Sequence, residues 1–358
     1  MNETLKDQIV SEMLNTEYTY MSDVYKTQDL MQHFADSGVD ITSEDFKTAW
    51  VAAHNKVEEI SWGKTGDQMT FEDFTGVEKE ALANVSAGLS DGFCMIYITG
   101  DTHGLIDLDK IRRFSVSPEG KRMTKNDYLI VLGDFGCCWF GKQEKGTKRY
   151  YELEANGLLD FDADVQDFWK TRKWTTLFID GNHENHDLLN QYPISEWNGG
   201  KVHFIADNVI HLMRGQVFNI EGHTFFTMGG AQSTDKAYRK EGFSWWASEM
   251  PSNGEYGEAI LNLENHDMKV DYVLTHCCPE QYISTMMWAV YNRSHNQLTG
   301  FLEHLLIDRQ LEFGHWYFGH YHYDEDNGRF HLMYQVIRPL DNIESDREEE
   351  GSNEYEPS

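Results

Sequence analysis

Basic residues and long apolar runs are scarce in this chain of 358 residues. Only 30 Lys and Arg accompany 60 Asp and Glu, which gives a formal net charge of −30. A basic surface spread over the whole protein is therefore excluded, and we expect no binding of duplex nucleic acid. If the protein acts on an anionic substrate, that substrate must be attracted locally, most simply by a bound metal ion. No segment approaches the ~18 consecutive apolar residues of a spanning helix, so we expect no membrane protein.

Cysteine is also rare, with five residues in the chain. Four of them form two adjacent pairs, Cys137 with Cys138 and Cys277 with Cys278, and the fifth is Cys94. Adjacent cysteines lack the C-x-x-C spacing that suits tetrahedral zinc, and five cysteines are too few for a disulfide framework in a chain of this length. We expect reduced thiols that serve as small buried residues near strand ends.

Several sequence signals of other protein classes are missing. The first residues, MNETLKDQIV, carry an early acid and precede no apolar stretch of the kind found in secretory signals. We therefore expect a cytoplasmic location. The chain contains no Gly-rich nucleotide loop, no nucleophile elbow and no internal repeat.

Charge and apolar spacing divide the chain into three parts. Residues 1–90 hold seventeen acids and six bases, and apolar residues recur at helical spacing in 4–14 and 44–60. We predict an acidic helical accessory module there. Residues 341–358 hold eight acids and one base with almost no apolar residues, which predicts a disordered acidic tail. We predict a separate folded domain in the remaining part, 91–340.

Five short apolar runs in this middle part predict buried strands. They read CMIYITGD, DYLIVLGD, TTLFIDGN, DYVLTH and HWYFGH. The stretches between the first four are long enough for helices or further strands, and this alternation predicts an α/β sandwich. Four more strand-like runs lie between residues 201 and 230 and indicate a second sheet.

Each of the five runs ends in polar residues suited to metal binding. Because ligands bind at the carboxyl ends of strands in open α/β sheets, we expect these side chains to meet at one edge. A single Asp or His in a turn would mean little, but eight such groups after five strands predict a metal site. They are Asp101, His103, Asp134, Asn182, His183, His276, His320 and His322.

The ordered motifs GDTHG, GDFG, GNHE, TH and GHYH resemble those of the calcineurin-like metallophosphoesterase superfamily. The segments 177–203 and 211–233 are also similar to a bacterial and phage group of that superfamily. The resemblance covers residues 94 to 340. It implies a four-layer αββα sandwich, here with an N-terminal helical extension, and a two-metal site at the carboxyl ends of the strands.

The resemblance also implies roles for the individual residues. Asp101, His103 and His322 would hold one metal, Asn182, His276 and His320 the other, and Asp134 would bridge them. His183 would be the catalytic histidine that stabilises or protonates the leaving oxygen. Mixed carboxylate, imidazole and amide ligands suit Mn²⁺ best, with Fe or Zn²⁺ as alternatives. The implied reaction is in-line attack on a phosphate mono- or diester by a hydroxide that bridges the metals.

The second motif departs from one branch of the superfamily. Phosphoprotein phosphatases and diadenosine tetraphosphate hydrolases carry GDxxDRG, whose second Asp orients the catalytic His and whose Arg binds phosphate, whereas this chain reads GDFGCCW. Arg239 is a candidate for phosphate binding, alongside the alternatives Lys236, Lys240 and Arg214. A solvated basic loop is the competing interpretation of this region. His186 and His315 match no position of the family, and we expect them to pack or to support ligands.

An active phosphoesterase is the leading hypothesis, since every expected ligand position holds a competent residue type. A nucleotide or dinucleotide hydrolase and a nuclease share the same metal site, and the acidity argues against the nuclease only for duplexes. A scaffold that has lost catalysis is the third hypothesis. The expected substrate is a phosphorylated small molecule, a nucleotide or a phosphoprotein, and the sequence leaves the oligomeric state open.

Overall fold

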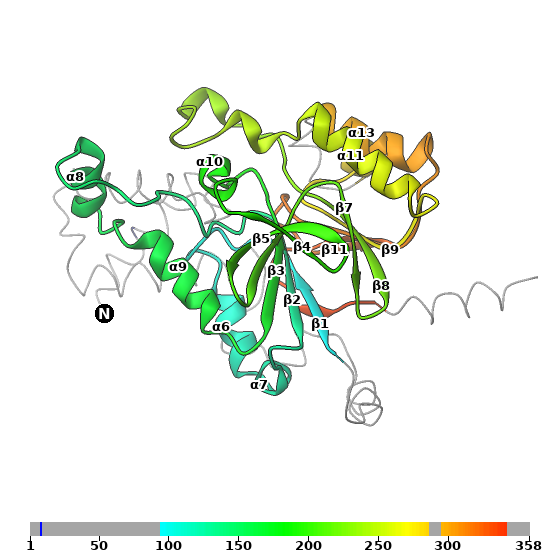
Figure 1. Ribbon diagram of the computed structural model, residues 1–358, viewed down its shortest axis with the longest axis horizontal. Helices are drawn as coiled ribbons and strands as arrows, with labels where there is room; N and C mark the ends of the chain where they lie inside the picture. The colour runs from blue at the N-terminus through cyan, green and yellow to red at the C-terminus, as the bar shows by residue number, and fades with distance from the viewer. Residues whose placement is uncertain (1–7, 9–93, 286–294, 342–358) are drawn as a thin grey trace, which may run out of the picture. The chain divides into compact units, whose positions relative to one another are not determined.

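The computed structural model describes residues 94–285 and 295–341, together with Gln8 (Figure 1). The chain divides into two compact units, Met1–Phe93 and Cys94–Ser358, and the fold given below belongs to the second. Gln8 apart, the accessory module predicted for 1–90 lies outside the described residues. The tail predicted for 341–358 lies outside them as well, except for Asp341.

The first sheet contains seven strands in the order β13-β1-β2-β3-β6-β5-β4. Strands β1, β2, β3 and β6 are parallel, and β13, β5 and β4 run antiparallel to their neighbours. Their bounds are β1 Ile96–Thr99, β2 Tyr128–Leu132, β3 Thr175–Ile179, β4 Ile194–Trp197, β5 Gly200–Ala206, β6 Val209–Leu212 and β13 Arg338–Pro339.

The second sheet contains six strands in the order β11-β12-β10-β9-β8-β7. Strands β8, β9, β10 and β12 are parallel, and β7 and β11 pair antiparallel at the two edges. Their bounds are β7 Gln216–Ile220, β8 His223–Met228, β9 Lys269–Thr275, β10 Glu312–Phe318, β11 Glu325–Asn327 and β12 Phe330–Leu332.

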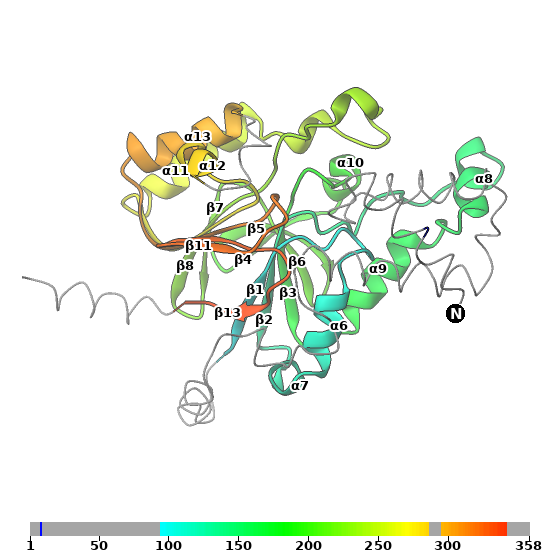
Figure 2. The same cartoon turned by 180° about the vertical axis from the view of Figure 1, so that it is seen from behind.

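Helices cover the outer face of each sheet (Figures 1 and 2). On the first sheet these are mainly α6 Asp109–Val116, followed by the short α7 Pro118–Arg122, and α9 Phe161–Lys170. Helix α8 Lys148–Ala155 lies away from the sheet, and α10 His186–Leu189 follows the carboxyl end of β3 (Figure 1). On the second sheet the helices are α11 Asn253–Glu264, α12 Glu280–Thr285 and α13 Gln297–Ile307. Two short 3₁₀ turns, η2 Lys236–Tyr238 and η3 Ala247–Glu249, precede α11.

Local sequence fixes where the helices of the second sheet begin. Ser252 and Glu255 form a reciprocal capping box at α11, and Asn296 and Thr299 form one at α13. Each box satisfies backbone N–H groups that the first turn of a helix cannot pair internally. Both helices therefore start at positions that their residues specify.

Alternation along the strands builds three apolar layers. In β2, Leu129 and Val131 pack under the helices of the first sheet, whereas Ile130 and Leu132 pack between the sheets. In β10, Trp316 packs under α11 and α13, whereas Tyr317 faces the layer between the sheets. Because both faces of these strands are buried, their sequences read as continuous apolar runs. Three cores separated by two sheets make the predicted four-layer αββα sandwich.

One expectation about the sheets is wrong in part. All four strand-like runs between residues 201 and 230 form strands, but KVHFIA and NVIHLM become β5 and β6 of the first sheet. Only QVFNI and HTFFTM, which become β7 and β8, belong to the second. Apolar alternation predicts a strand but carries no signal for the sheet that it joins. No helix among the described residues is long and apolar enough to cross a membrane.

Candidate metal centre

Five parallel strands from both sheets end at one edge of the sandwich. Residues after β1, β2 and β3 of the first sheet supply Asp101, His103, Asp134, Asn182 and His183. Residues after β9 and β10 of the second supply His276, His320 and His322. The parallel direction of these strands is what gathers residues from distant parts of the chain.

A first group of possible ligands contains Asp101, His103, Asp134 and His322, whose ligand atoms lie within 4.8 Å of one another. Nε2 of His103 is 3.3 Å from Oδ2 of Asp134, and Nε2 of His322 is 3.2 Å from Oδ2 of Asp101. These are the residues that the family resemblance implies for one metal, together with the implied bridging carboxylate.

A second group contains Asp134, His276 and His320. Nε2 of His276 is 3.3 Å both from Oδ1 of Asp134 and from Oδ1 of Asn182. Nδ2 of Asn182 donates to Oγ of Ser233 at 3.2 Å, which leaves the amide oxygen facing His276. Asp134 is common to both groups, so its two carboxylate oxygens can reach two neighbouring cations.

Unpaired atoms in the first group indicate that it fits a cation. Oδ2 of Asp101, Nε2 of His103 and Oδ2 of Asp134 are buried and have no hydrogen-bond partner among the described residues. Buried polar atoms normally have a partner, because an unsatisfied one costs about 1–3 kcal/mol. A bound cation would satisfy all three, and the mixed carboxylate and imidazole set suits Mn²⁺, Fe or Zn²⁺.

Hydrogen bonds at Nδ1 orient two histidines so that their Nε2 atoms face the centre. Nδ1 of His103 lies 2.7 Å from Oδ2 of Asp107, and Nδ1 of His276 lies 2.7 Å from the carbonyl oxygen of Leu132. A proton on Nδ1 is therefore donated to each acceptor, which places the lone pair on Nε2. Asp107 lay outside the sequence prediction, although its position four residues after His103 on a turn is a usable signal.

Burial and neighbouring charges shift the pKa values of the centre. Burial would raise the pKa of Asp134, but the charges of His276 and His183 and the close approach of His103 hold that pKa well below its usual range. Burial would also raise the pKa of Asp101, but His276 and His322 lower it below the usual value of a carboxyl group. Burial lowers the pKa of His320 to about 3, with His276 as a second cause. Both carboxylates are thus charged at neutral pH, as cation binding requires.

The backbone at the centre is unusual. His103, Asp134, His320 and His322 all have positive φ, between +43° and +70°. Non-glycine residues rarely adopt this region, and each such residue costs of order 1 kcal/mol or more. Four strained residues at one place show that ligand placement takes precedence over local backbone preference.

Glycines beside these ligands leave no space for a side chain. A Cβ on Gly133, which has φ +93°, would overlap Nδ1 of His276, and one on Gly181 would overlap Oδ1 of Asp134. We expect Gly133→Ala to weaken metal binding about 10- to 100-fold, because it displaces His276 from its carbonyl partner. Gly146→Ala is the matched control, since Gly146 has φ +101° and nothing within 4 Å of its Cβ. Titration of both variants with Mn²⁺ measures the difference, and equal affinities would contradict the expectation.

His183 lies beside the first group and carries Arg239 against its ring. The ring centroids of His183 and His103 are 5.3 Å apart, and the backbone N–H of His183 donates to Oδ1 of Asp134 at 2.7 Å. Nη1 of Arg239 is 3.3 Å from Nδ1 of His183, and Nε of Arg239 donates to Asp235 at 2.6 Å. Burial lowers the pKa of His183 to about 3, and nearby charges of His103 and Arg239 offset the opposing effect of Asp134.

Comparison with known proteins agrees with this geometry. The sequence model of the calcineurin-like phosphoesterase family matches residues 95–324, which is more than half of the chain. The chain belongs to the calcineurin-like phosphoesterase family. No match is found among curated proteins. The predicted bacterial and phage group within the superfamily stays a prediction.

One residue that supports the centre of this phosphoesterase lay outside the sequence prediction. Glu184, the last residue of GNHE, is buried, and its carboxylate accepts from the backbone N–H of Phe135 at 2.6 Å and of Gly136 at 3.1 Å. It fixes the loop after β2 that carries Asp134. Burial, with the Asp134 charge as a second cause, raises the pKa of Glu184 well above its usual value. Lys110, also buried, donates to the carbonyl oxygen of Asp101 at 2.7 Å.

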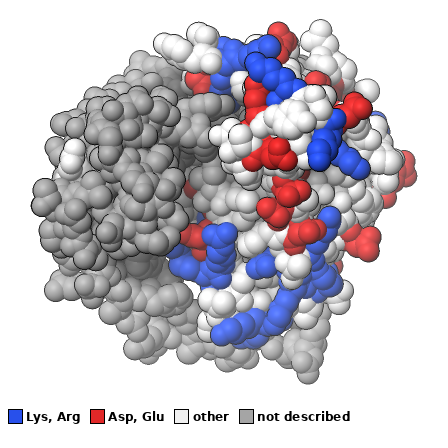
Figure 3. Space-filling model, turned by 90° about the vertical axis from the view of Figure 1, so that its left-hand side faces the viewer, with Lys and Arg blue, Asp and Glu red and all other residues white. Residues whose placement is uncertain are grey.

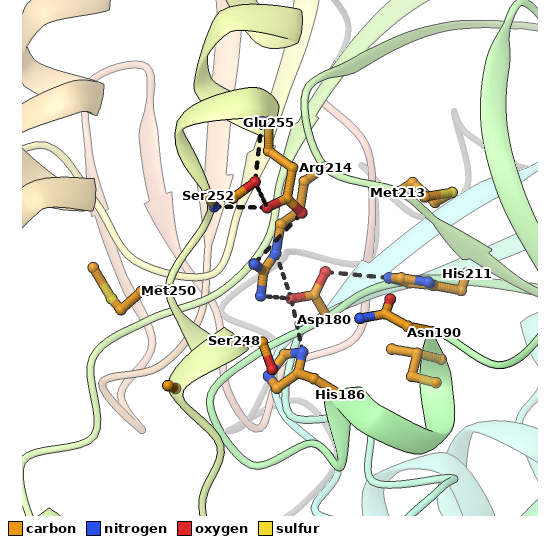
Figure 4. Close-up of a pocket in the computed structure, with 12 residues that line it drawn as sticks. Asp180, His186, Asn190, His211, Met213, Arg214, Ser248, Met250, Ser252 and Glu255 are labelled. Carbon is orange, nitrogen blue, oxygen red and sulfur yellow. Dashed lines mark hydrogen bonds and ion pairs between the residues drawn. The ribbon is translucent and has the colours of Figure 1, made fainter.

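Arg214, one of the alternatives for phosphate binding, is buried in an ion pair with Asp180 (Figure 4). Its Nε and Nη2 donate to Oδ2 of Asp180 at 2.8 and 2.5 Å, and Nη2 also donates to the carbonyl oxygen of Glu249 at 3.1 Å. Arg214 therefore does not fit the phosphate-binding alternative. A buried pair leaves no signal in the local sequence, because its partner lies on another strand.

The remaining candidates are placed as follows. Lys236 pairs with the buried Glu249 at 2.6 Å, and Lys240 is exposed. His186 is buried beside Asp180, and His315 lies 2.9 Å from His331 in a separate group with Asp341. Both histidines are buried, and their supporting role stays a prediction. Cys137, Cys138, Cys277 and Cys278 are buried free thiols, which confirms their interpretation as small buried residues.

Proposed function

We propose that this calcineurin-like phosphoesterase hydrolyses phosphate mono- or diesters by in-line displacement at a site that holds two divalent cations. The observation that carries the proposal is the pair of ligand groups that share Asp134. Two cations bound there would polarise the phosphoryl oxygens and lower the pKa of a coordinated water. We propose Mn²⁺ as the preferred ion, with Fe or Zn²⁺ as alternatives, because the ligands mix carboxylates with imidazoles.

Individual side chains of the protein position the ligands and assist the leaving group. Asp134 holds its charge at neutral pH and positions both halves of the site, while Asp107 and the Leu132 carbonyl orient His103 and His276. His183 is the residue that donates a hydrogen bond or a proton to the leaving oxygen. Before substrate binds, its lowered pKa keeps it neutral. A bound phosphate anion favours its protonation, as an opposite charge does for any histidine.

Arg239 is our candidate for binding a phosphoryl oxygen. Its guanidinium contacts both ring nitrogens of His183, at 3.3 and 3.4 Å, so it lies where a substrate next to His183 would be. A guanidinium can donate two parallel hydrogen bonds to phosphate. Asp235 accepts from Nε and the carbonyl oxygen of Ser244 accepts from Nη1 at 3.3 Å, while both terminal nitrogens lie against His183.

Metal removal and replacement tests the proposal. We expect the protein treated with a chelator to lose hydrolysis of p-nitrophenyl phosphate and its bis ester, and to regain it with two equivalents of Mn²⁺. A parallel panel with a dinucleoside polyphosphate and a phosphopeptide ranks the substrate classes. Two bound equivalents without hydrolysis of any substrate would instead support the non-catalytic scaffold, and activity that survives chelation would contradict the proposal.

A further inference from the structure

Two chain segments that are rich in basic residues, in a protein that is otherwise acidic, meet beside His183. We call residues 139–149 and 236–246 together the basic–aromatic rim. They contain seven bases and two acids, within a chain whose formal charge is −30. The segments are in contact, because the guanidinium carbon of Arg149 lies 3.9 Å from the ring centroid of Phe243 and 5.2 Å from that of Phe140. Arg239, on the second segment, reaches His183.

Several cations of the rim are available to a ligand. Lys142, Lys145 and Lys240 are exposed and form no ion pair with a carboxylate within the described part of the chain. One face of the described residues shows Lys and Arg gathered in an upper and a lower group with acidic side chains between them (Figure 3). An acidic protein can still bind a polyanion where exposed lysines without a carboxylate partner lie.

Aromatic rings alternate with these cations. Tyr238 is 93% exposed and Phe243 is 42% exposed, and Nζ of Lys240 lies 5.7 Å from the Phe243 centroid. Trp139 is half-buried, and its ring lies parallel to that of His183 within 24°, with centroids 6.5 Å apart. A cation next to an open ring is the combination on which bases of a single strand stack while its phosphates are neutralised.

We propose that the basic–aromatic rim binds single-stranded nucleic acid and that a phosphodiester of the bound strand is the substrate of the metal centre. The inference rests on the proposed function and names its substrate class. Hydrolysis would consume one water: the bond from phosphorus to the attacking oxygen forms, the bond from phosphorus to a sugar oxygen breaks, and that sugar oxygen takes up a proton. Four of the seven bases pair with carboxylates, which leaves Lys142, Lys145 and Lys240 to contact several phosphates of one strand, whereas a singly phosphorylated peptide offers one phosphate.

The geometry favours a single strand over a duplex. Asp134 and His276 are at most 1% exposed, so the scissile phosphate must enter below the surface to reach them. A flexible strand can bend into such a site, and its unpaired bases are free to stack. A stiff duplex would keep its bases paired and bring far more charge toward a protein of net charge −30.

Binding measured with the metals chelated separates this inference from the proposed function. The probe is a fluorescein-labelled twelve-residue oligothymidylate, followed by anisotropy at low salt. We expect Lys145→Glu combined with Lys240→Glu to weaken binding at least ~10-fold and to flatten its salt dependence. We expect Tyr238→Ala with Phe243→Ala to weaken it to a similar extent with little change in salt dependence, because stacking is lost and charge is not.

A matched control comes from the opposite edge of the sheet. Lys121 and Lys173 are exposed and precede β2 and β3, so they lie at the amino ends of strands whose carboxyl ends form the metal centre. Lys121→Glu combined with Lys173→Glu makes the same charge change and should leave binding within about twofold. An equal loss in this control, no binding by the unaltered protein, or displacement of the oligonucleotide by an equal concentration of a phosphoserine peptide would each overturn the inference. Binding without hydrolysis would support the rim and count against the proposed function alone.

Discussion

Replacing Asp134 by Asn should reduce turnover roughly 10³-fold or more while the protein stays folded. The amide keeps the shape of the carboxylate and can still accept from the backbone N–H of His183. It removes the negative charge that both ligand groups share, so we expect the metal content to fall below two per chain. Metal analysis, circular dichroism and turnover at saturating Mn²⁺ check the three parts of this prediction.

Asp271→Asn is the control for the loss of one charge. Asp271 lies near the start of β9 and accepts from Thr224, at the end of that strand remote from His276. We expect its activity to stay within about twofold of the unaltered protein. If Asp134→Asn retained more than a tenth of normal turnover, Asp134 would not be the shared ligand.

Replacing His183 by Ala should leave both metals bound and lower turnover about 10²- to 10⁴-fold, as expected for loss of a general acid. The loss should be larger for an alkyl phosphate than for p-nitrophenyl phosphate, whose leaving group needs no proton. Kinetics on the two substrates, with metal content measured in parallel, give the result.

Two further variants narrow the interpretation of His183. His304→Ala, at an exposed position on α13, should change nothing. Arg239→Met should raise KM by a similar factor for both substrates, because a phosphate contact is indifferent to the leaving group. Equal losses for both substrates in His183→Ala would show that His183 binds or orients the substrate and does not protonate it.

The sequence predicted the features that depend on a single strand and the residues directly after it. The runs ending at Asp101, Asp134 and Asn182 were recognisable because strands buried on both faces contain little but apolar residues. The eight polar residues that follow the strands were predictable for the same reason, and the structure brings all eight to one edge. Their individual roles stay predictions.

The parts that depend on contacts between distant residues were not predictable. Glu184 acts on the backbone of Phe135, and Asp180 neutralises Arg214, and neither pair is visible in the order of residues. The same holds for the placement of β5 and β6 in the first sheet. Net charge was misleading in another way, because a total of −30 conceals the local excess of bases at residues 139–149 and 236–246.

The metal centre draws its ligands from both sheets, and this has a consequence for the order of events during synthesis. Asp101 is made first, and His320 and His322 emerge only after β10, the last strand to supply a ligand. A nascent chain that ends before these histidines already contains six of the seven strands of the first sheet, all but β13, but it lacks part of each ligand group. Domains are built from the amino end as the ribosome proceeds. We therefore expect a complete cation site only late in synthesis, when most strands of both sheets have been made.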